Sequence, residues 1–432
     1  MNALRRRLDP SLDCARALDA DDELGAFRRR FALPRDGART LVYLCGHSLG
    51  LMPKEAPRLV QRELDRWAER GVDGHFEADG AGSGWFDYHE RFAAPLAELT
   101  GAMPREVVAM NTLTVNLHLM LVSFFRPTRD RYKIVIERNA FPSDRYAVQS
   151  QLRWHGLDPA EALLELAPPA GARSLGPDAL DALLEREGER VALVLLPGVQ
   201  YLTGEALDLA AAVRTARKHG CRIGFDLAHA VGNVPLALHR SGADFAVWCS
   251  YKYLNAGPGA VGGCFVHERA AAEAGLPRLA GWWGHVPERR FAADREFRPM
   301  AGAAAWQLSN PPILSLAPLA ASLALFEEAG LERLRAKSER LTRYLEFLLE
   351  AKLPGRVEVL TPAEPQRRGC QLSLRIVPAP RDGRELARRL RAAGVVGDWR
   401  EPDVLRLAPV PLYNRFRDVY DAVQALAKVL DE

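Results

Sequence analysis

The sequence has little that could hold a metal ion or form a disulfide framework. Its six cysteines are scattered over 432 residues, with no Cys-x-x-Cys pair. No cysteine and histidine spacing suits zinc. We therefore expect no bound metal, and reduced thiols of this kind favour a cytoplasmic location.

The chain also lacks an excess of one charge and any long apolar run. It carries 58 Lys and Arg residues against 55 Asp and Glu residues, a formal net charge of +3. This balance predicts neither a nucleic-acid partner nor a membrane partner. No apolar run approaches the roughly 18 residues of a transmembrane helix. The N-terminal stretch is rich in arginine and aspartate, so we expect no signal peptide and no secretion.

What is present is the composition of a large globular protein. Hydrophobic residues make up 48% of the chain and charged residues 26%, and a length of roughly 150 residues per domain suggests two or three domains. Apolar runs at 132–137, 191–199, 221–226 and 245–249 alternate with helical patterns. Such alternation indicates βαβ units and a mostly parallel sheet, in which ligands bind at the carboxyl ends of the strands.

The pattern changes after the turn at 310–312. Residues 315–351 read as one long helical run, and residues 356–432 alternate short strands with helices at 383–393 and 416–430. This predicts a smaller α+β domain behind a large α/β domain. The predicted units are an N-terminal segment that packs with the small domain (1–45), the large domain (46–311) and the small domain (312–432).

One lysine follows the most apolar of the predicted strands. Phe245–Cys249 lead directly into Ser250, Tyr251 and Lys252. A buried lysine is costly unless it is paired or used covalently, because desolvation disfavours the ammonium. The functional interpretation is a Schiff-base lysine. The alternative, a lysine that simply reaches the surface, is the commoner case for an isolated lysine after a strand.

A carboxylate 26 residues upstream favours the functional interpretation. Asp226 ends the preceding predicted strand, and His229 follows it by one helical turn's spacing. A carboxylate on a pyridine nitrogen keeps that nitrogen protonated, so that the ring can accept electrons from a carbanion. The Asp226 and Lys252 pair therefore indicates pyridoxal phosphate, against a core Asp/His pair as the alternative. Asp144 also follows a predicted strand and should reach the same crevice.

A candidate anion site precedes an apolar helix predicted over 111–126. The segment begins with asparagine and threonine, which are good helix-capping residues. The free backbone N–H groups at such a helix start are suited to bind a phosphate. A glycine-rich segment at 71–86, which holds His75, is too long for a simple turn and is a second candidate for a functional loop.

Several short stretches resemble kynureninase. They are FPSD (141–144), PGVQYLTGE (197–205), DLAHAVGN (226–233), WCSYKYLNAGPG (248–259), GWWGH (281–285), SNPP (309–312) and RLAPVPLYN (406–414). Their order and spacing match from YLCGHSLGL (43–51) to the C-terminus, so the resemblance covers nearly the whole chain. It implies an α/β fold of the fold-type-I, aminotransferase class V-like kind, and a homodimer with shared active sites. The implied reaction is hydrolysis of L-kynurenine to anthranilate and L-alanine, in tryptophan degradation or in supplying NAD precursors.

The resemblance also implies roles for individual residues. Lys252 would hold pyridoxal 5'-phosphate, Asp226 would face the pyridine nitrogen, and Tyr251 would bind the phosphate and relay a proton. The other implied cofactor residues are Leu113 through its backbone, Thr114, Phe141, Ser143, Asp144 and His229, with Trp282 and Asn310 closing the pocket from the partner subunit. The implied substrate residues are Arg406 for the carboxylate, and His75, Ser48, Ser309 and Asn310 around the ring. Hydrogen bonds from this set predict that 3-hydroxykynurenine is also accepted.

Each assignment has a simpler alternative. Phe141 could be a core residue, Arg406 an exposed residue of an edge strand, Trp282 a packing residue and His75 a solvated loop residue. Pro197 departs from some relatives, which have a small hydroxyl residue there, and this puts a cofactor contact at that position in doubt.

Two other functions stay open. A cysteine desulfurase shares the implied fold but needs a mobile nucleophilic cysteine, and the late candidate, Cys370, lies where the chain enters a predicted strand. From another class, the chain could be a catalytically silent binding protein that keeps the fold. The combination of Asp226, His229, Lys252 and Arg406 argues against a silent protein.

Overall fold

The largest element of the fold is a seven-stranded sheet. The structure is a computed structural model that describes residues 8–77, 84–169, 174–176, 178–292, 294–380 and 382–432. The strand order is β4-β10-β9-β8-β7-β5-β6. The strands are β4 (Val107–Ala109), β5 (Lys133–Glu137), β6 (Leu163–Leu166), β7 (Val191–Pro197), β8 (Arg222–Asp226), β9 (Phe245–Cys249) and β10 (Gly262–Val266). Neighbours from β9 to β6 pair in parallel, whereas β10 pairs antiparallel with both β9 and β4.

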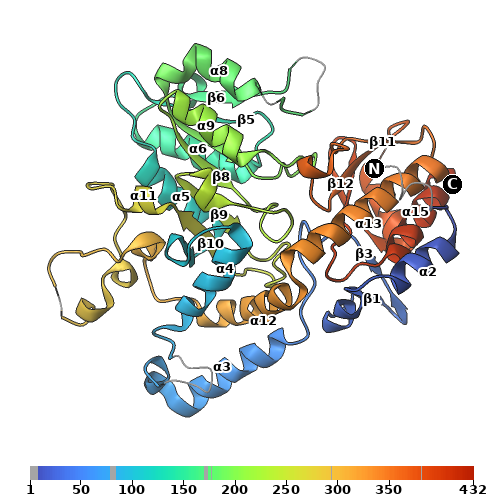
Figure 1. Ribbon diagram of the computed structural model, residues 1–432, viewed down its shortest axis with the longest axis horizontal. Helices are drawn as coiled ribbons and strands as arrows, with labels where there is room; N and C mark the ends of the chain where they lie inside the picture. The colour runs from blue at the N-terminus through green and yellow to red at the C-terminus, as the bar shows by residue number, and fades with distance from the viewer. Residues whose placement is uncertain (1–7, 78–83, 170–173, 177, 293, 381) are drawn as a thin grey trace.

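Both faces of this sheet are covered, which explains its continuous apolar strands. Along β7, Leu193 and Leu195 join one hydrophobic cluster, while Val194 and Leu196 join the other. The first cluster includes side chains of α5 and α6, and the second includes side chains of α8, α9 and α12 (Figure 1). The helices of this large unit are α3 (Ala56–Arg70), α4 (Ala93–Thr100), α5 (Leu113–Phe124), α6 (Pro142–Trp154), α7 (Pro159–Ala162), α8 (Ala179–Glu187), α9 (Leu209–Lys218), α10 (Leu238–Ser241), α11 (Glu268–Ala271) and α12 (Ile313–Ala329).

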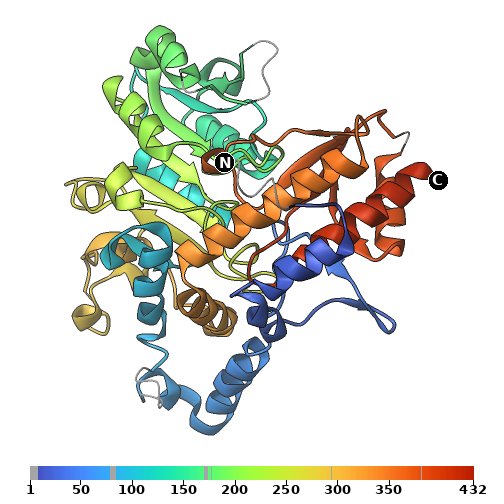
Figure 2. The ribbon, with the colours of Figure 1, turned by 45° about the vertical axis from the view of Figure 1, so that its right-hand side comes forward.

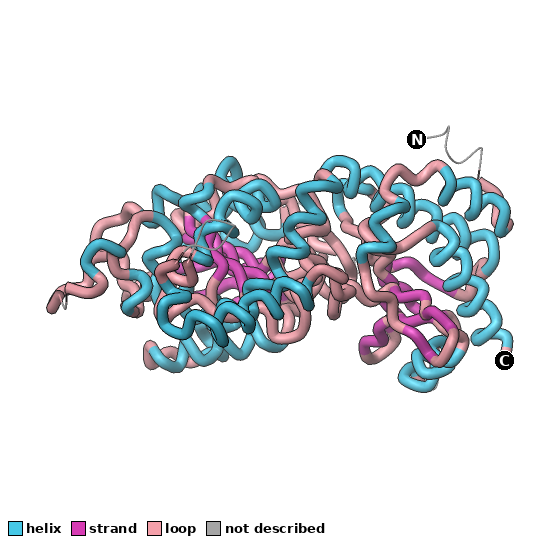
Figure 3. Tube along the Cα trace, turned by 90° about the horizontal axis from the view of Figure 1, so that it is seen from below, coloured by secondary structure: helices cyan, strands magenta, loops and turns pink. Residues whose placement is uncertain are grey.

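A second, smaller sheet is antiparallel, in the order β11-β12-β15-β14. Figures 2 and 3 show it well apart from the large sheet, with its own covering helices. Its elements are α13 (Leu331–Lys352), β11 (Val357–Val359), β12 (Leu372–Ile376), α14 (Gly383–Ala392), β13 (Val395–Val396), β14 (Asp398–Arg400), β15 (Val404–Leu407) and α15 (Phe416–Asp431). The expected alternation of strands and helices over 356–432 is therefore observed. The short strands β13 and β14 were not predicted.

The N-terminal segment touches both units. Its elements are α2 (Leu12–Ala20), β1 (Arg35–Asp36), β2 (Arg39–Thr40) and β3 (Val42–Tyr43). Ala15 and Leu44 lie in the hydrophobic cluster of the small unit, and β3 pairs in parallel with β13. Phe27 and Phe31, in contrast, belong to the cluster that fills the large unit and continues to Tyr413, whose ring centre lies 5.2 Å from that of Phe31.

The prediction of one continuous helix over 315–351 is wrong. The segment consists of two helices, α12 and α13, whose axes differ in direction by 83°. Gly330 separates them with a φ of 75°, a conformation that glycine adopts at little cost. Leu316, Leu323 and Phe326 of α12 pack into the core of the large unit, so the chain leaves that unit near Gly330 and not at 312.

No single helix of the described residues has the length and apolar composition needed to cross a membrane, although α12 and α13 taken together meet that test as a bent pair. Most of the α12 side chains are buried inside the protein.

Candidate active site

A pocket lies at the carboxyl ends of β5, β7 and β8. Because these strands are parallel neighbours, their last residues meet at one edge, and Pro197 pairs directly with Asp226. The pocket is lined by Leu113, Thr114, Ile136, Glu137, Ala140, Phe141, Ser143, Asp144, Leu195, Leu196, Pro197, Val199, Tyr201, Asp226, Ala228, His229, Tyr251 and Lys252. Nine residues of the predicted cofactor set are therefore in one place.

Lys252 stands half-buried in this pocket, beside two aromatic rings. Its Nζ lies 5.8 Å from the ring centre of Phe141 and 5.8 Å from that of Tyr251. Phe141 is 41% exposed and caps the start of α6, so it is not the core residue of the simpler alternative. Its ring makes an edge contact with Tyr201 at 5.4 Å. The lysine and the phenylalanine thus both line the pocket.

Two buried carboxyl groups lie together on the same wall of the pocket. Asp226 ends β8, and its Oδ1 accepts a hydrogen bond from the Ala228 N–H at 2.7 Å. Burial raises the pKa of Asp144 well above its ordinary value, and the charge of Asp226 and a hydrogen bond to it raise this pKa further. Nearby Lys252 opposes the rise. Burial and the neighbouring carboxylate therefore favour the protonated form of Asp144.

The start of α5 lies at one end of the pocket and is suited to bind an anion. Thr112 precedes the helix and its side chain does not cap it, so the first backbone N–H groups stay available. Thr114 Oγ1 lies 2.9 Å from Ser143 Oγ, at the start of α6. A Cβ on Gly262 would lie 3.1 Å from the Leu113 nitrogen, so glycine lets β10 approach this helix start closely.

His229 and Tyr251 complete the pocket with uncharged polar groups. Burial lowers the pKa of His229 well below its ordinary value, and the charges of Lys252 and Arg406 lower it further. Its Nδ1 is buried and, within the described ranges, has no hydrogen-bond partner. Burial, followed by the neighbouring Cys249, raises the pKa of Tyr251. Its hydroxyl is therefore a proton donor at neutral pH.

Arg406 and Ser48 lie next to the pocket but outside its lining. Arg406 is on β15, between β12 and β14, and is 1% exposed, so the alternative of an exposed edge residue is wrong. Its Nη1 donates to the carbonyl oxygen of Tyr201, a lining residue, at 2.6 Å. Its Nη2 reaches Ser48 Oγ at 3.4 Å and contacts the carboxylate of Asp398.

The remaining predicted residues are not brought to Lys252 by this chain. His75, Trp282, Ser309 and Asn310 do not line the pocket. Ser309 and Asn310 are exposed, and the Trp282 Nε1 donates to the Arg290 carbonyl at 2.9 Å. Residues 78–83 of the glycine-rich segment lie outside the described residues.

His75, Trp282, Ser309 and Asn310 lie at or beside an aromatic surface. We define this surface as Phe76, Phe86, Trp282 and Phe291. The Phe76 ring lies 6.2 Å from His75 and 6.3 Å from Phe291, and Phe291 lies 5.4 Å from Trp282. The Trp283 N–H donates to the Leu308 carbonyl, which brings Ser309 and Asn310 alongside. Phe76 and Phe291 are among the most exposed large apolar side chains.

Sequence reasoning missed Glu137 and Tyr201 in the pocket and Asp398 beside Arg406. Glu137 is the last residue of β5, which pairs directly with β7. Its position at the end of a strand could therefore have indicated that it lies in the pocket. Burial raises its pKa to about 7. Tyr201 lies in the PGVQYLTGE stretch but acts through its carbonyl and ring, so the stretch gave it no role. Asp398 lies on a strand of three residues, which has no recognisable local pattern.

Comparison with known proteins decides the family. Residues 334–426 match the family model described as "Kynureninase C-terminal domain". The chain is 57% identical over 409 residues to the Kynureninase of Xanthomonas oryzae. The matched region covers 95% of this chain and 96% of the relative. The chain belongs to the kynureninase family. The Kynureninase of Stenotrophomonas maltophilia is 55% identical over 408 residues, at 94% of this chain and 96% of the relative.

Solved structures show that the kynureninase family shares its fold with more distant enzymes. The cysteine desulfurase CsdA of Escherichia coli superposes with a TM-score of 0.76 at 18% identity, over 95% of this chain and 98% of that chain. The cystine C-S lyase C-DES, solved with its product cysteine persulfide, superposes with a TM-score of 0.74 at 21% identity. The match covers 90% of this chain and 98% of that chain. The predicted fold-type-I architecture is confirmed.

Proposed function

We propose that this chain is a pyridoxal-phosphate-dependent kynureninase that hydrolyses L-kynurenine to anthranilate and L-alanine. One observation carries the proposal: a lysine, a pair of buried carboxyl groups and the start of α5 line the same pocket. These three features complement the aldehyde, the ring nitrogen and the phosphate of the cofactor. Family membership supports the choice of substrate.

The residues present fit this cofactor. Lys252 would hold it covalently, with Phe141 on one face of the ring and Asp226 at the ring nitrogen. Asp144 Oδ1 is buried and, among the described residues, has no hydrogen-bond partner. A buried polar atom of this kind is costly unless a bound group satisfies it. The start of α5, with Thr114 and Ser143, would bind the phosphate.

When bound, pyridoxal phosphate supplies an electron sink for charge that forms at the substrate α-carbon. The protein's own groups would position the substrate and move its protons. Lys252 Nζ, which lies in the pocket, would accept the α-proton. Tyr251 Oη, which burial keeps protonated, would donate a proton during the cleavage. Arg406 would orient the substrate carboxylate with its planar fork.

A cofactor test separates this proposal from a silent protein that only keeps the fold. The purified protein should show a visible absorption band with added pyridoxal phosphate, and Lys252→Ala should lose that band and the release of anthranilate. Lys218→Ala, which removes an exposed lysine far from the pocket, is the matched control. A parent protein without the band would refute the cofactor, and an active Lys252→Ala protein would refute the role of the lysine.

We further propose a homodimer whose active sites are shared between subunits. The aromatic surface supports this, because it exposes Phe76 and Phe291 beside four predicted site residues that this chain does not bring to Lys252. Co-expressed Lys252→Ala and Trp282→Ala/Asn310→Ala chains should regain activity that neither has alone. Failure to regain activity, with mixed dimers demonstrated, would contradict shared sites.

The substrate ring would lie near His75, Ser48, Ser309 and Asn310, so 3-hydroxykynurenine should also be accepted. The ratio of kcat/KM for the two substrates tests this in the parent and in His75→Phe. An unchanged ratio would remove His75 from ring recognition. We also propose a cytoplasmic location, which the six unpaired cysteines support.

A further inference from the structure

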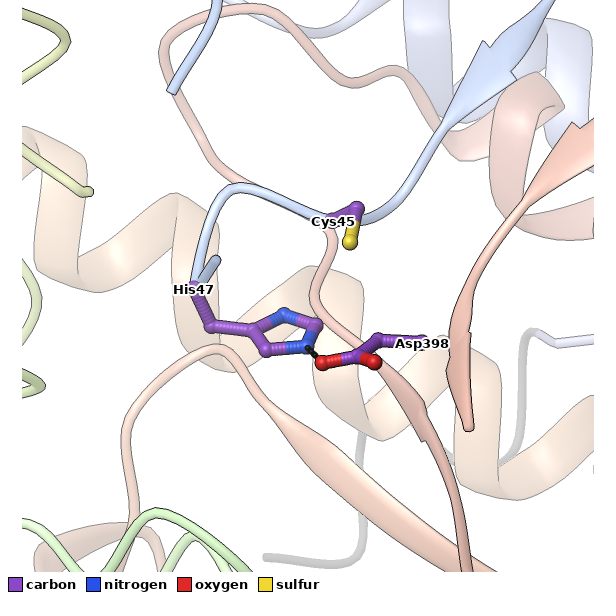
Figure 4. A group of neighbouring side chains, drawn as sticks. All are labelled: Cys45, His47 and Asp398. Atoms are coloured by element: carbon purple, nitrogen blue, oxygen red, sulfur yellow. Dashed lines mark ion pairs between the residues drawn. The ribbon is translucent and has the colours of Figure 1, made fainter. Parts of the chain in front are cut away.

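Donors converge on a single carboxylate oxygen beside the pocket. Asp398 Oδ2 accepts hydrogen bonds from Ser48 Oγ at 2.9 Å and from Arg400 Nη2 at 3.0 Å, and it contacts Arg406 Nη2. The His47 Nε2 lies 3.4 Å away (Figure 4). We call these residues the Asp398 cluster. The sequence analysis predicted no contact between Asp398 and any of these residues.

The fold explains how this carboxylate reaches Arg406. In the antiparallel pair of β14 and β15, Asp398 lies directly opposite Arg406. Side chains opposite each other on such a pair are within direct reach, and Arg400 is on the same face because it is two residues along the strand. β14 is the edge strand of its sheet, so it is hydrogen-bonded on one side only. Asp398 can therefore withdraw without breaking the centre of the sheet.

The groups around Asp398 are suited to bind an anion. The Arg406 guanidinium is buried, and a buried charge needs a partner of opposite sign. Cys45, His47 and Asp398 have ligand atoms within 4.8 Å of one another, a spacing that a metal ion could use. Two guanidinium groups already contact Asp398, however, and they would repel a cation placed there. A carboxylate is the group that the two arginines and the serine complement.

We propose that Asp398 is an internal substitute for the substrate carboxylate, which holds Arg406 in the free protein and is displaced when substrate binds. This inference rests on the proposed function, in which Arg406 binds the substrate carboxylate. Arg406 cannot satisfy both carboxylates through the same Nη2 group. Asp398 therefore acts as a positioning residue that lowers the affinity for α-carboxylates while it keeps the guanidinium in place.

The test is the affinity of the cofactor-loaded protein for L-alanine and for ethylamine, its counterpart without a carboxylate. Asp398→Asn keeps the shape and an oxygen acceptor but removes the charge. Binding is followed by the change in the visible absorption band. Asp398→Asn should bind L-alanine about tenfold more tightly, as expected for one charged hydrogen bond no longer in competition. Its affinity for ethylamine should not rise.

A matched control is Asp403→Asn. Asp403 is on the same β14–β15 connection and pairs with Arg375 at 2.6 Å, so this change removes the same charge and also breaks an Asp–Arg pair. It should leave both affinities unchanged. The melting temperature is the second readout. Without ligand Asp398→Asn should melt below the parent, and L-alanine should raise its melting temperature more than it raises that of the parent.

Weaker or unchanged L-alanine binding in Asp398→Asn would overturn the inference, because Asp398 would then be only an anchor for Arg406. A parent protein whose band does not respond to L-alanine would overturn it as well. If Asp398→Asn does not fold, Asp398→Ser is measured in its place with the same expectation. A parent that binds L-alanine but releases no anthranilate from L-kynurenine refutes the proposed function alone.

Discussion

Glu137 should make the stability of this protein fall as the pH rises through neutrality. Its carboxyl is buried at the end of β5, its Oε2 has no partner within the described part of the chain, and burial raises its pKa from 4.5 to about 7. The unfolded chain releases this proton at lower pH than the native state. The native state is therefore favoured below pH 4.5, and this stabilisation is lost as the pH rises to about 7. The full loss corresponds to roughly 3 kcal/mol, at 1.36 kcal/mol for each pKa unit.

Urea unfolding of the cofactor-free protein measures this effect. The difference in unfolding free energy between Glu137→Gln and the parent should shift by roughly 2 to 3 kcal/mol in favour of the variant between pH 5 and pH 8.5, because glutamine cannot ionise. Protein concentration is held fixed, since a dimer would make the stability depend on it. Glu189→Gln, at an exposed position, should show no such shift. A difference for Glu137→Gln that is independent of pH would refute the reasoning.

Three further substitutions test the site. Gly50→Ala would place a Cβ 2.3 Å from the Lys252 carbonyl oxygen, so it should cost about 1 to 3 kcal/mol of stability and weaken cofactor retention, whereas Gly176→Ala, with nothing within 4 Å, should do neither. Arg406→Lys should lower kcat/KM for L-kynurenine at least about tenfold, because an ammonium cannot make two parallel hydrogen bonds to a carboxylate; unchanged kinetics would contradict the role of the fork. Cys370→Ser should keep the parental activity, since this thiol is buried and burial raises its pKa to about 12; a large loss would favour sulfur chemistry.

The cofactor pocket could be predicted because its residues follow buried, mostly apolar strands. β8 ends at Asp226, and Lys252 comes shortly after β9, which ends at Cys249. Parallel neighbours bring their carboxyl ends together, and strand ends alone therefore predict the convergence. Assigning Phe141 and Thr114 to the site needed the family resemblance.

Other features depend on tertiary contacts that no local pattern encodes. β4 and β14 have three residues each, too few for a periodic signal. The Asp398 cluster depends on the pairing of β14 with β15 and on Ser48 from the far end of the chain. The break at Gly330 was missed because apolar residues continue on both sides of it. The domain boundary followed the turn at 310–312, although packing assigns α12 to the large unit.

The most direct test of the central claim is product formation by the cofactor-loaded protein. Anthranilate fluorescence is recorded after addition of L-kynurenine, and sulfide is measured in parallel after addition of L-cysteine. A kynureninase should release anthranilate in many turnovers, with an equal amount of L-alanine, and should release no comparable sulfide. Sulfide without anthranilate, or neither product from a protein that has bound pyridoxal phosphate, would contradict the account.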